Sequence, residues 1–237
     1  MLKVNEIFGP TIQGEGKSAG KEVVFLRVAL CNLHCVWCDT PYTWNFVGNK
    51  SKHPDKFHRE AEVHSMSDQE VVDKIYQTAG DVRSLVISGG EPVMQCKNLT
   101  NILRALDGWW VEVETNATLI GNEEFDGLVN QYNCSPKLSN SEDPKELRIR
   151  KEALRHYASM NKSTFKFVFR NEGDLEEILD LVKTYRIVGS RVYLMPLGLN
   201  REQLELTRDG AKYWAEKFKF NYSERLHVVQ FGGVRGV

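Results

Sequence analysis

Long apolar runs are missing from this chain of 237 residues. No stretch approaches the ~20 consecutive apolar residues that span a bilayer. Residues 1–6 lack the apolar core of a secretory signal peptide. Internal repeats and low-complexity tracts are missing as well. We therefore expect a cytoplasmic protein that has no membrane partner.

An excess of charge of either sign is also missing. The 31 lysine and arginine residues nearly balance the 32 aspartate and glutamate residues. Proteins that bind nucleic acids commonly carry a strong basic excess on one face, so the composition does not favour a nucleic-acid partner. The length suffices for one α/β domain with a sizeable core. We expect one domain over residues 1–237.

The five cysteines are an odd number, and three of them, Cys31, Cys35 and Cys38, lie within eight residues. Such crowding does not suit a disulfide framework, and a reducing cytoplasm keeps thiols free. The three clustered cysteines are therefore predicted to be metal ligands. Cys96 and Cys134 are assigned structural roles.

Predicted strands alternate with predicted helices along most of the chain. The Ser67 to Glu70 stretch is a capping box that opens a helix, and the apolar face of this helix is predicted to be Val71, Val72, Ile75 and Tyr76. Two more helical patterns run through residues 99–106 and 175–182. The strand patterns cover residues 23–29, 84–88, 109–114, 164–169, 191–195 and 225–229, with a shorter one ending at Cys134.

This alternation indicates parallel βαβ units. About six units are present, fewer than the eight of a full barrel, which usually needs ~250 residues. The sequence therefore predicts an α/β fold, a partial and open βα barrel. Residues 45–65 are predicted to form a long inserted loop in which His53, His58 and His64 are solvated.

The cysteine cluster admits four interpretations. A structural zinc site needs a fourth ligand, such as His34, Cys96 or Cys134. A thiol redox pair would use Cys35 and Cys38 and leave Cys31 unexplained. Chance clustering is implausible at this density. An iron–sulfur cluster held by three thiolates keeps one iron open, and an open metal position binds and polarises a small molecule directly.

The Cys-x₃-Cys-x₂-Cys spacing after a first strand resembles the radical S-adenosylmethionine (SAM) superfamily. The resemblance implies a radical SAM core in which Cys31, Cys35 and Cys38 hold a catalytic 4Fe–4S cluster. Its open iron chelates SAM, which is cleaved to a 5′-deoxyadenosyl radical. It also implies SAM contacts in Ser88-Gly89-Gly90-Glu91-Pro92 and elsewhere. The implied cofactor-binding residues are Trp37, Asp39, Gly90, Glu91, Glu114, Ser135, Pro136 and Lys137.

Within the superfamily, Gln13-Gly14-Glu15-Gly16, Arg27, Asp39-Thr40 and the tail at residues 232–237 resemble the 7-carboxy-7-deazaguanine synthase family. Residues 5–16 are predicted to be a short strand and a glycine-rich substrate-binding loop. The family converts 6-carboxy-5,6,7,8-tetrahydropterin to 7-carboxy-7-deazaguanine with loss of ammonia, on the way to queuosine and other 7-deazapurines. The implied substrate-binding residues are Ile12, Gln13, Gly14, Glu15, Arg27, Ser88, His227 and the chain carboxylate of Val237.

Further expectations follow from the same resemblance. They are Mg²⁺ on the hydroxyl of Thr40, an electron donor such as flavodoxin or ferredoxin, and a homodimer. Two rivals stay open. One is another small radical SAM enzyme, such as an activase that makes a glycyl radical on a partner protein. The other is a zinc-stabilised binding module without catalysis, which leaves the Gly-Gly-Glu-Pro turn without a role.

Overall fold

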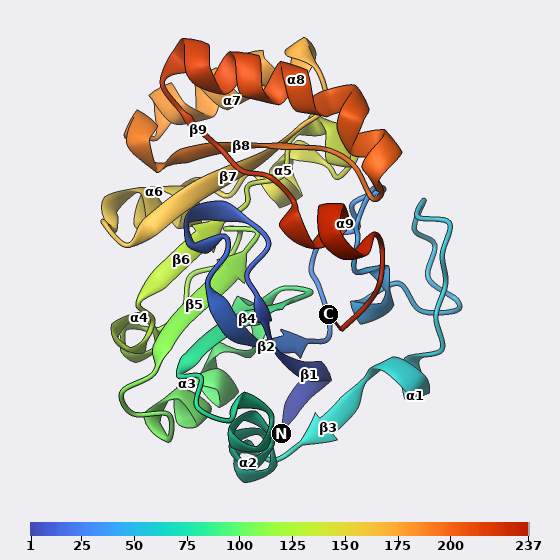
Figure 1. Cartoon of the computed structure of the whole chain (residues 1–237), viewed down its shortest axis with the longest axis vertical. Coiled ribbons are helices and arrows are strands. Elements are labelled where there is room, and N and C mark those ends of the chain that lie inside the picture. The colour runs from blue at the N-terminus through green and yellow to red at the C-terminus, as the bar shows by residue number, and fades with distance from the viewer. Residues whose placement is uncertain (237) are drawn as a thin grey trace.

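A curved sheet of nine strands forms the centre of the computed structural model, which describes residues 1–236 (Figure 1). The strand order is β3-β1-β2-β4-β5-β6-β7-β8-β9. The strands are β1 (Leu2–Ile12), β2 (Glu22–Val28), β3 (His64–Met66), β4 (Ser84–Gly89), β5 (Trp110–Thr115), β6 (Gln131–Cys134), β7 (Ser163–Phe169), β8 (Val192–Pro196) and β9 (Asn221–Tyr222). Every neighbouring pair from β2 to β9 is parallel, whereas β1 is antiparallel to both β2 and β3.

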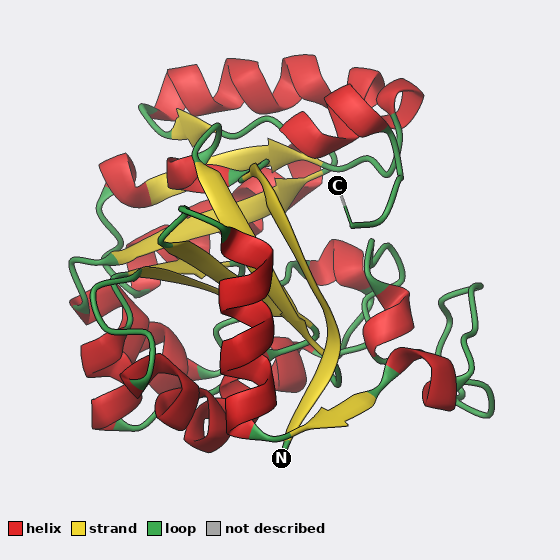
Figure 2. Cartoon of the chain, turned by 60° about the horizontal axis from the view of Figure 1, so that its bottom comes forward, coloured by secondary structure: helices red, strands yellow, loops and turns green. Residues whose placement is uncertain are grey.

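The first and last strands in this order do not pair within the described residues, so the barrel is open, as predicted. Crossover helices cover the outer face of the sheet (Figures 1 and 2). They are α2 (Asp68–Ala79), α3 (Cys96–Arg104), α4 (Glu123–Leu128), α6 (Lys151–Ser159), α7 (Glu172–Thr184) and α8 (Arg201–Phe218). Three shorter helices are α1 (Arg59–Glu62), α5 (Lys145–Arg148) and α9 (Leu226–Phe231). Across residues 1–236, no helix is both long and apolar enough to cross a bilayer.

Side chains alternate between two environments along each central strand, because successive residues of a strand point to opposite faces. In β5, Val111 and Val113 belong to the hydrophobic core under the helices, whereas Glu112 and Glu114 point inward. The same alternation puts Phe165 and Phe167 of β7 in the core and Lys166 between them on the inner face. The sheet thus separates an apolar outer layer from a polar interior.

The predicted capping box is present at the start of α2. The Ser67 hydroxyl accepts a hydrogen bond from the Glu70 backbone N–H at 3.3 Å, and the Glu70 carboxylate accepts one from the Ser67 backbone N–H at 2.7 Å. Val71, Val72 and Ile75 are buried against the sheet. Tyr76 lies at the edge of this face, packed edge-on against Trp109.

The prediction for residues 225–229 was wrong, because this apolar stretch forms the helix α9 rather than a strand. Period alone does not distinguish a short helix from a strand in so short an apolar run. The parallel ladder ends instead at β9, which pairs with β8 through only two residues. Figure 1 shows α9 beside the blue loop that follows β1, and the Leu226 N–H donates to the Gly14 carbonyl at 2.9 Å.

Two further expectations need correction. The first strand is not short, because β1 runs for 11 residues and pairs along both of its edges. Residues 45–65 are not all loop, because they contain α1 and most of β3. His58 and His64 are exposed as expected, but His53 is buried, with its Nε2 3.0 Å from the Cys38 carbonyl oxygen. The inserted segment therefore packs against the cysteine loop.

Candidate functional site

A cavity of about 430 Å³ lies on the inner face of the sheet, at the C-terminal ends of the parallel strands. Active sites of βα barrels gather at this end. Most of the predicted site residues line it: Ile12, Gln13, Gly14, Glu15, Arg27, Cys31, Cys35, Trp37, Cys38, Asp39, Thr40, Ser88, Gly90, Glu114, Ser135, Lys137 and His227. Glu91 and Pro136 do not line it, and Val237 lies outside the described residues.

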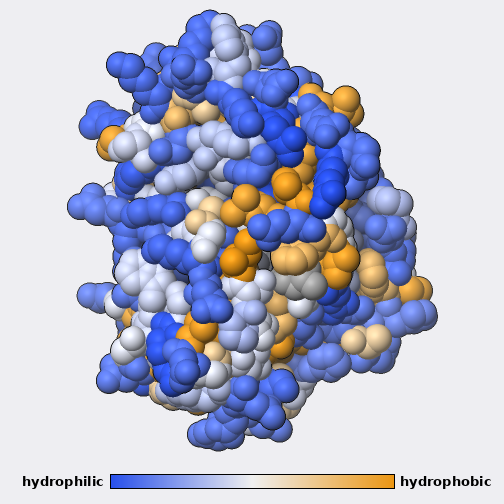
Figure 3. Space-filling view, in the orientation of Figure 1, coloured by the Kyte–Doolittle hydropathy of each residue, from blue (hydrophilic) through white to orange (hydrophobic). Residues whose placement is uncertain are grey.

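Apolar side chains border one side of this region. Figure 3 shows hydrophobic groups gathered in the middle of the face where α9 lies in Figure 1. Phe231, the last residue of α9, and Val234 are among the exposed apolar residues. The segment from Gly232 to Gly236 continues along the cavity and contributes to its lining.

The three clustered cysteines occur together in the cavity wall, and burial sets their acidity. It raises the pKa of the Cys31 thiol to about 12 and also raises the pKa values of Cys35 and Cys38. Thiolates are the metal-binding form, so a cation bound here offsets the cost of deprotonating buried thiols. Two N–H groups point at the sulfurs: Trp44 Nε1 is 3.3 Å from Cys38 Sγ, and the Leu33 backbone nitrogen is 3.5 Å from Cys31 Sγ.

The spacing of these thiols fits a cluster better than a single zinc ion. A tetrahedral zinc with Zn–S bonds of 2.3 Å needs its sulfurs about 3.8 Å apart. Among the described residues, the one group of three potential ligands whose atoms all lie within 4.8 Å is Glu15, Asp39 and His227, so at least two of the three cysteine sulfurs lie more than 4.8 Å apart. Cys96 and Cys134 do not line the cavity and supply no fourth thiolate. The residues present therefore fit a three-thiolate iron–sulfur cluster.

Glycine permits a very close approach between the loop after β4 and the start of the cysteine loop. A Cβ on Gly90 would lie 1.9 Å from the Leu30 carbonyl oxygen, and a Cβ on Gly89 would lie 2.1 Å from that of Val28. The Glu91 backbone N–H donates to the Leu30 carbonyl at 2.8 Å. Both glycines are thus needed where the two loops touch.

Glu91 does not line the cavity, and its side chain instead holds the loop after β4 in place. Its carboxylate accepts hydrogen bonds from the backbone N–H groups of Val93 and Asn116 and from the Thr115 hydroxyl, at 2.7–3.0 Å. Burial raises the pKa of this carboxyl, while these donors oppose the shift. The side chain therefore fastens the end of β4 to the end of β5.

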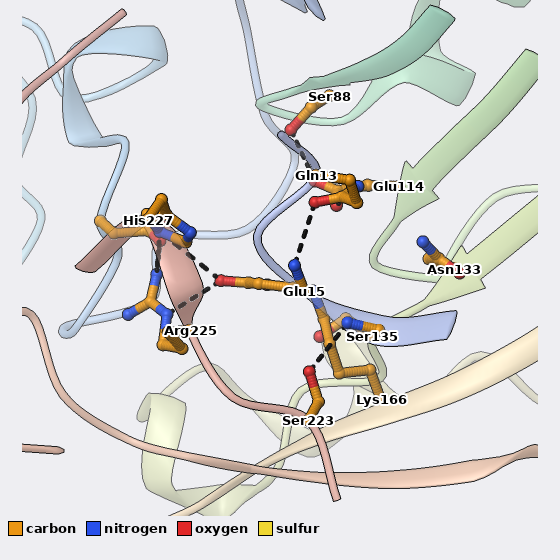
Figure 4. Close-up of polar contacts among 12 residues, drawn as sticks. Gln13, Glu15, Ser88, Glu114, Asn133, Ser135, Lys166, Ser223, Arg225 and His227 are labelled. Atoms are coloured by element: carbon orange, nitrogen blue, oxygen red, sulfur yellow. Dashed lines mark hydrogen bonds and ion pairs between the residues drawn. The ribbon is translucent and has the colours of Figure 1, made fainter. Parts of the chain in front are cut away.

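Gln13 has an unexpected position in the barrel interior (Figure 4). Its side-chain amide donates to Glu112 at 3.0 Å and to Glu114 at 3.1 Å, and its carbonyl oxygen accepts from the Glu15 backbone N–H at 3.1 Å. Glu114 also accepts a hydrogen bond from the Ser88 hydroxyl at 2.8 Å. Gln13 therefore orients two carboxylates, and its side-chain amide is engaged within the protein.

Glu15 is the centre of a buried group of charges (Figure 4). It pairs with Lys166 and, at 2.9 Å, with Arg225 Nε, while His227 Nε2 lies 3.8 Å away. Burial alone would raise the pKa of Glu15, but the cations outweigh it and hold this pKa well below its ordinary value of 4.5. Burial lowers the pKa of His227 below 6.5, which favours its neutral form at pH 7.

Sequence reasoning missed Lys166 and Arg225. Lys166 is a charged residue flanked by apolar residues in strand β7, and it points to the inner face of the sheet. Arg27 was singled out in β2 because it has the same kind of apolar neighbours. Arg225 directly precedes α9 and carried no local signal. A charged residue inside an apolar strand is expected to have a buried partner, and this reasoning could have found Lys166.

Acid should weaken the fold through Glu15. Because its pKa is lowered in the folded protein, Glu15 contributes stability above pH 4.5 that is lost as the pH falls further. We expect Glu15→Gln to reduce the free energy of unfolding at pH 7 and to make its decline below about pH 4.5 shallower. Urea unfolding of the cluster-free protein at several pH values measures this. Glu60→Gln, at an exposed position, is the matched control, and equal declines for wild type and Glu15→Gln would refute the expectation.

Arg27 contributes another cationic group to the cavity lining. Its Nε pairs with Glu6 at 2.7 Å, and its guanidinium lies 5.1 Å from the Phe8 ring centre and 5.8 Å from that of Tyr42. Arg235 of the C-terminal segment lies 4.0 Å above the same Tyr42 ring and is 3.3 Å from Glu6. Arg235 is therefore held next to Arg27.

Comparison with known proteins identifies relatives of this chain. The profile of the Radical SAM superfamily matches residues 27–209. A 7-carboxy-7-deazaguanine synthase from Pyrobaculum aerophilum is 36% identical over 99% of this chain and 97% of its own length. One from Hyperthermus butylicus is 31% identical over 97% and 92%. The crystal structure of QueE from Escherichia coli matches with a TM-score of 0.69 at 21% identity, covering 95% of this chain and 94% of that one.

Proposed function

The chain belongs to the radical SAM superfamily and, within it, to the 7-carboxy-7-deazaguanine synthase family, and from this premise we propose its reaction. It contracts the ring of 6-carboxy-5,6,7,8-tetrahydropterin to give 7-carboxy-7-deazaguanine with loss of ammonia, in queuosine and 7-deazapurine biosynthesis. The observation that carries the proposal is a single cavity that joins the cysteine loop to Glu15 and Arg27.

The enzyme uses a 4Fe–4S cluster and SAM. Cys31, Cys35 and Cys38 hold the cluster, which with SAM supplies a 5′-deoxyadenosyl radical when both are bound. The SAM side of the cavity is proposed to comprise Trp37, Asp39, Gly90, Glu91, Glu114, Ser135, Pro136 and Lys137. Glu91 contributes by holding the loop that carries Gly90, as its buried carboxylate indicates. The Trp37 ring is fixed by a hydrogen bond of 2.9 Å from its Nε1 to the Asn140 carbonyl.

The substrate side is proposed to comprise Ile12, Gln13, Gly14, Glu15, Arg27, Ser88, His227 and the chain end at Val237. A planar guanidinium matches a carboxylate by paired hydrogen bonds, so Arg27 is assigned to the pterin carboxylate. The neutral imidazole of His227 offers one donor and one acceptor to a heterocycle edge. Gln13 acts through the orientation of Glu114.

Magnesium is assigned to Thr40. Mg²⁺ commonly takes few protein ligands and completes its shell with substrate oxygens and water. The Thr40 hydroxyl lies in the cavity wall, 3.6 Å from Cys38 Sγ. A metal held there would bring the substrate carboxylate close to the cysteine loop.

The enzyme acts on a small molecule and needs an external one-electron reductant. Flavodoxin or ferredoxin is our proposal for that donor, and the enzyme is proposed to be a homodimer. All five cysteines are free in the structure, which supports the proposal of a reducing cytoplasm. The near balance of charge supports the absence of a nucleic-acid partner.

The test is an anaerobic incubation of the reconstituted protein with 6-carboxytetrahydropterin, SAM, Mg²⁺ and dithionite, followed by mass spectrometry. Formation of 7-carboxy-7-deazaguanine with little loss of SAM is expected. Deoxyadenosine without that product would assign the enzyme to another substrate, as for a glycyl-radical activase. Neither product from protein with an intact cluster would refute the proposed reaction.

Arg27→Lys should weaken substrate binding. Lysine keeps the charge but loses the paired hydrogen bonds, so the KM for the pterin is expected to rise about 10- to 100-fold. Steady-state kinetics at saturating SAM measure this. The control is Arg83→Lys, at an exposed arginine just before β4, outside the cavity lining. An unchanged KM in Arg27→Lys would remove Arg27 from the carboxylate site.

A further inference from the structure

Arg225 contacts three separate segments with a single guanidinium group. Its Nε donates to Glu15 at 2.9 Å, its first terminal nitrogen donates to the Gly198 carbonyl at 2.5 Å, and its second donates to Asp39. Figure 4 shows the contact with Glu15. The residue is buried, with 4% of its surface exposed, and it lines the cavity.

The segments joined here come from the two halves of the proposed site. Glu15 belongs to the loop assigned to the substrate, and Asp39 directly follows the last cysteine of the cluster loop. Ser223 and Leu226, on either side of Arg225, bind the first of these loops: the Ser223 hydroxyl accepts from the Gly16 N–H at 2.8 Å, and the Leu226 N–H donates to Gly14. The C-terminal segment therefore holds the Glu15 loop at several points.

The link to Asp39 has no such support. Within residues 1–236, Arg225 supplies the one side-chain hydrogen bond of the Asp39 carboxylate, whose side chain is 46% exposed. His227 lies within 4.8 Å of the Asp39 carboxylate, but among residues 1–236 only Arg225 joins that side chain to the C-terminal segment by a hydrogen bond. Without Arg225, water can hydrate Asp39. Because Asp39 follows Cys38, movement of Asp39 is passed directly to a cluster ligand.

We propose that Arg225 is a positioning residue that fixes the cysteine loop relative to the substrate loop. This inference rests on the proposed function. An arginine fork holds its donors at fixed separations in one plane, so it sets the spacing of Glu15 and Asp39 as well as neutralising them. Lysine supplies the same charge on a single nitrogen and does not reproduce the three directed contacts.

The consequence concerns the fate of the radical. A radical enzyme must hold its substrate within reach of the radical it generates, and small displacements of reacting groups reduce rates strongly. If the two loops lose their fixed spacing, an electron from dithionite still cleaves SAM, but the radical takes a hydrogen atom from a buffer or protein C–H or S–H group instead of from the substrate. The donor radical left behind is reduced by a second electron from dithionite and a proton from water. Deoxyadenosine then accumulates relative to 7-carboxy-7-deazaguanine.

The experiment compares Arg225→Lys, Asp39→Asn and the double variant with wild type. In Arg225→Lys we expect normal iron and sulfide content and a ratio of deoxyadenosine to product raised about 10-fold or more. Asp39→Asn should raise it in the same direction. The double variant should show no larger ratio than Arg225→Lys alone, because both changes remove the same link.

Hydrogen exchange of the cluster-free protein provides a readout independent of activity. Arg225→Lys should raise exchange at both residues 12–17 and residues 36–41. The control is Arg208→Lys. Arg208 Nε pairs with Glu224 at 2.9 Å in the same C-terminal region, and neither residue lines the cavity. This variant should leave both segments and the product ratio unchanged.

Three outcomes would overturn the inference. One is a wild-type product ratio in Arg225→Lys. A second is unchanged exchange at residues 36–41. The third is a general rise in exchange accompanied by lower thermal stability and iron content, which would indicate a merely structural role. If wild type itself makes no 7-carboxy-7-deazaguanine, the proposed function fails, and the exchange comparison still decides whether Arg225 joins the two loops.

Discussion

Cys35→Ala is expected to abolish product formation, with a loss of about 1,000-fold or more, because two thiolates do not retain a 4Fe–4S cluster built for three. Cys35 is 7% exposed in the cavity wall, so removing its sulfur leaves space without exposing a large surface. The variant should therefore fold. Iron and sulfide analysis after anaerobic reconstitution, together with product formation, measures the effect.

The matched control is Cys96→Ala. Cys96 begins α3 and lies outside the cavity lining. It should retain the wild-type iron content and the wild-type rate. An intact, active cluster in Cys35→Ala, or loss of the cluster in Cys96→Ala, would contradict the assignment of ligands.

Gly90→Ala should be nearly as damaging, although it adds a single methyl group. The added Cβ would lie 1.9 Å from the Leu30 oxygen and 2.4 Å from the Leu30 carbonyl carbon. Both are backbone atoms, so the clash is relieved only by moving the loop after β4 away from the start of the cysteine loop. Overpacking that forces the backbone to shift costs about 1–3 kcal/mol. We expect a lower melting temperature and a loss of activity of at least about 100-fold, because the displaced loop borders the reacting groups.

Gly127→Ala provides the comparison. Gly127 lies within α4, and nothing would lie within 4 Å of an added Cβ. Alanine is favoured over glycine in a helix by up to about 1 kcal/mol, so this variant should be as stable as wild type or more so. Thermal unfolding and the product assay apply to both variants. Equal behaviour of the two would show that the close loop contact is not required.

The central strands could be predicted because their pattern is strong and local. The strands β2, β4, β5, β7 and β8 were all found within about one residue of their observed bounds, since each is an apolar run rich in β-branched or aromatic residues. The short outer strands β3 and β9 were missed. Strands of three and two residues contain too few side chains to show a period, and they exist because a neighbouring strand offers a free edge.

The longest helix, α8, was also missed, for a different reason. Of its 18 residues, the fully buried ones are Leu204, Ala211 and Ala215, while Trp214 and Phe218 are partly buried against the core. Its large apolar residues therefore gather near the end of the helix, and the first turns carry few of them. Leu206 and Tyr213 are exposed and add misleading apolar signals.

The predicted site also contains local features that the sequence could reveal and distant pairings that it could not. The cysteine motif and the Gly-Gly-Glu-Pro turn are local patterns, and their resemblance to those of a known family predicted their chemistry. The charged group around Glu15 depends on partners distant in the chain: Lys166 is 151 residues away and Arg225 is 210 residues away. Such pairs become visible only once the fold has brought β7 and the C-terminal segment to the N-terminal loop.

The separation of Glu15 and Arg225 along the chain also sets the order in which their contacts form during synthesis. At a synthesis rate of about 5–20 residues per second, the ribosome reaches Arg225 roughly 10 to 40 s after it has made Glu15. The strands from β1 to β7 can pair in the meantime, but the Glu15 loop lacks its partners Ser223 and Arg225 until those residues have been made. Until then, the cysteine loop also lacks the contact between Asp39 and Arg225, so the cavity wall is incomplete on that side.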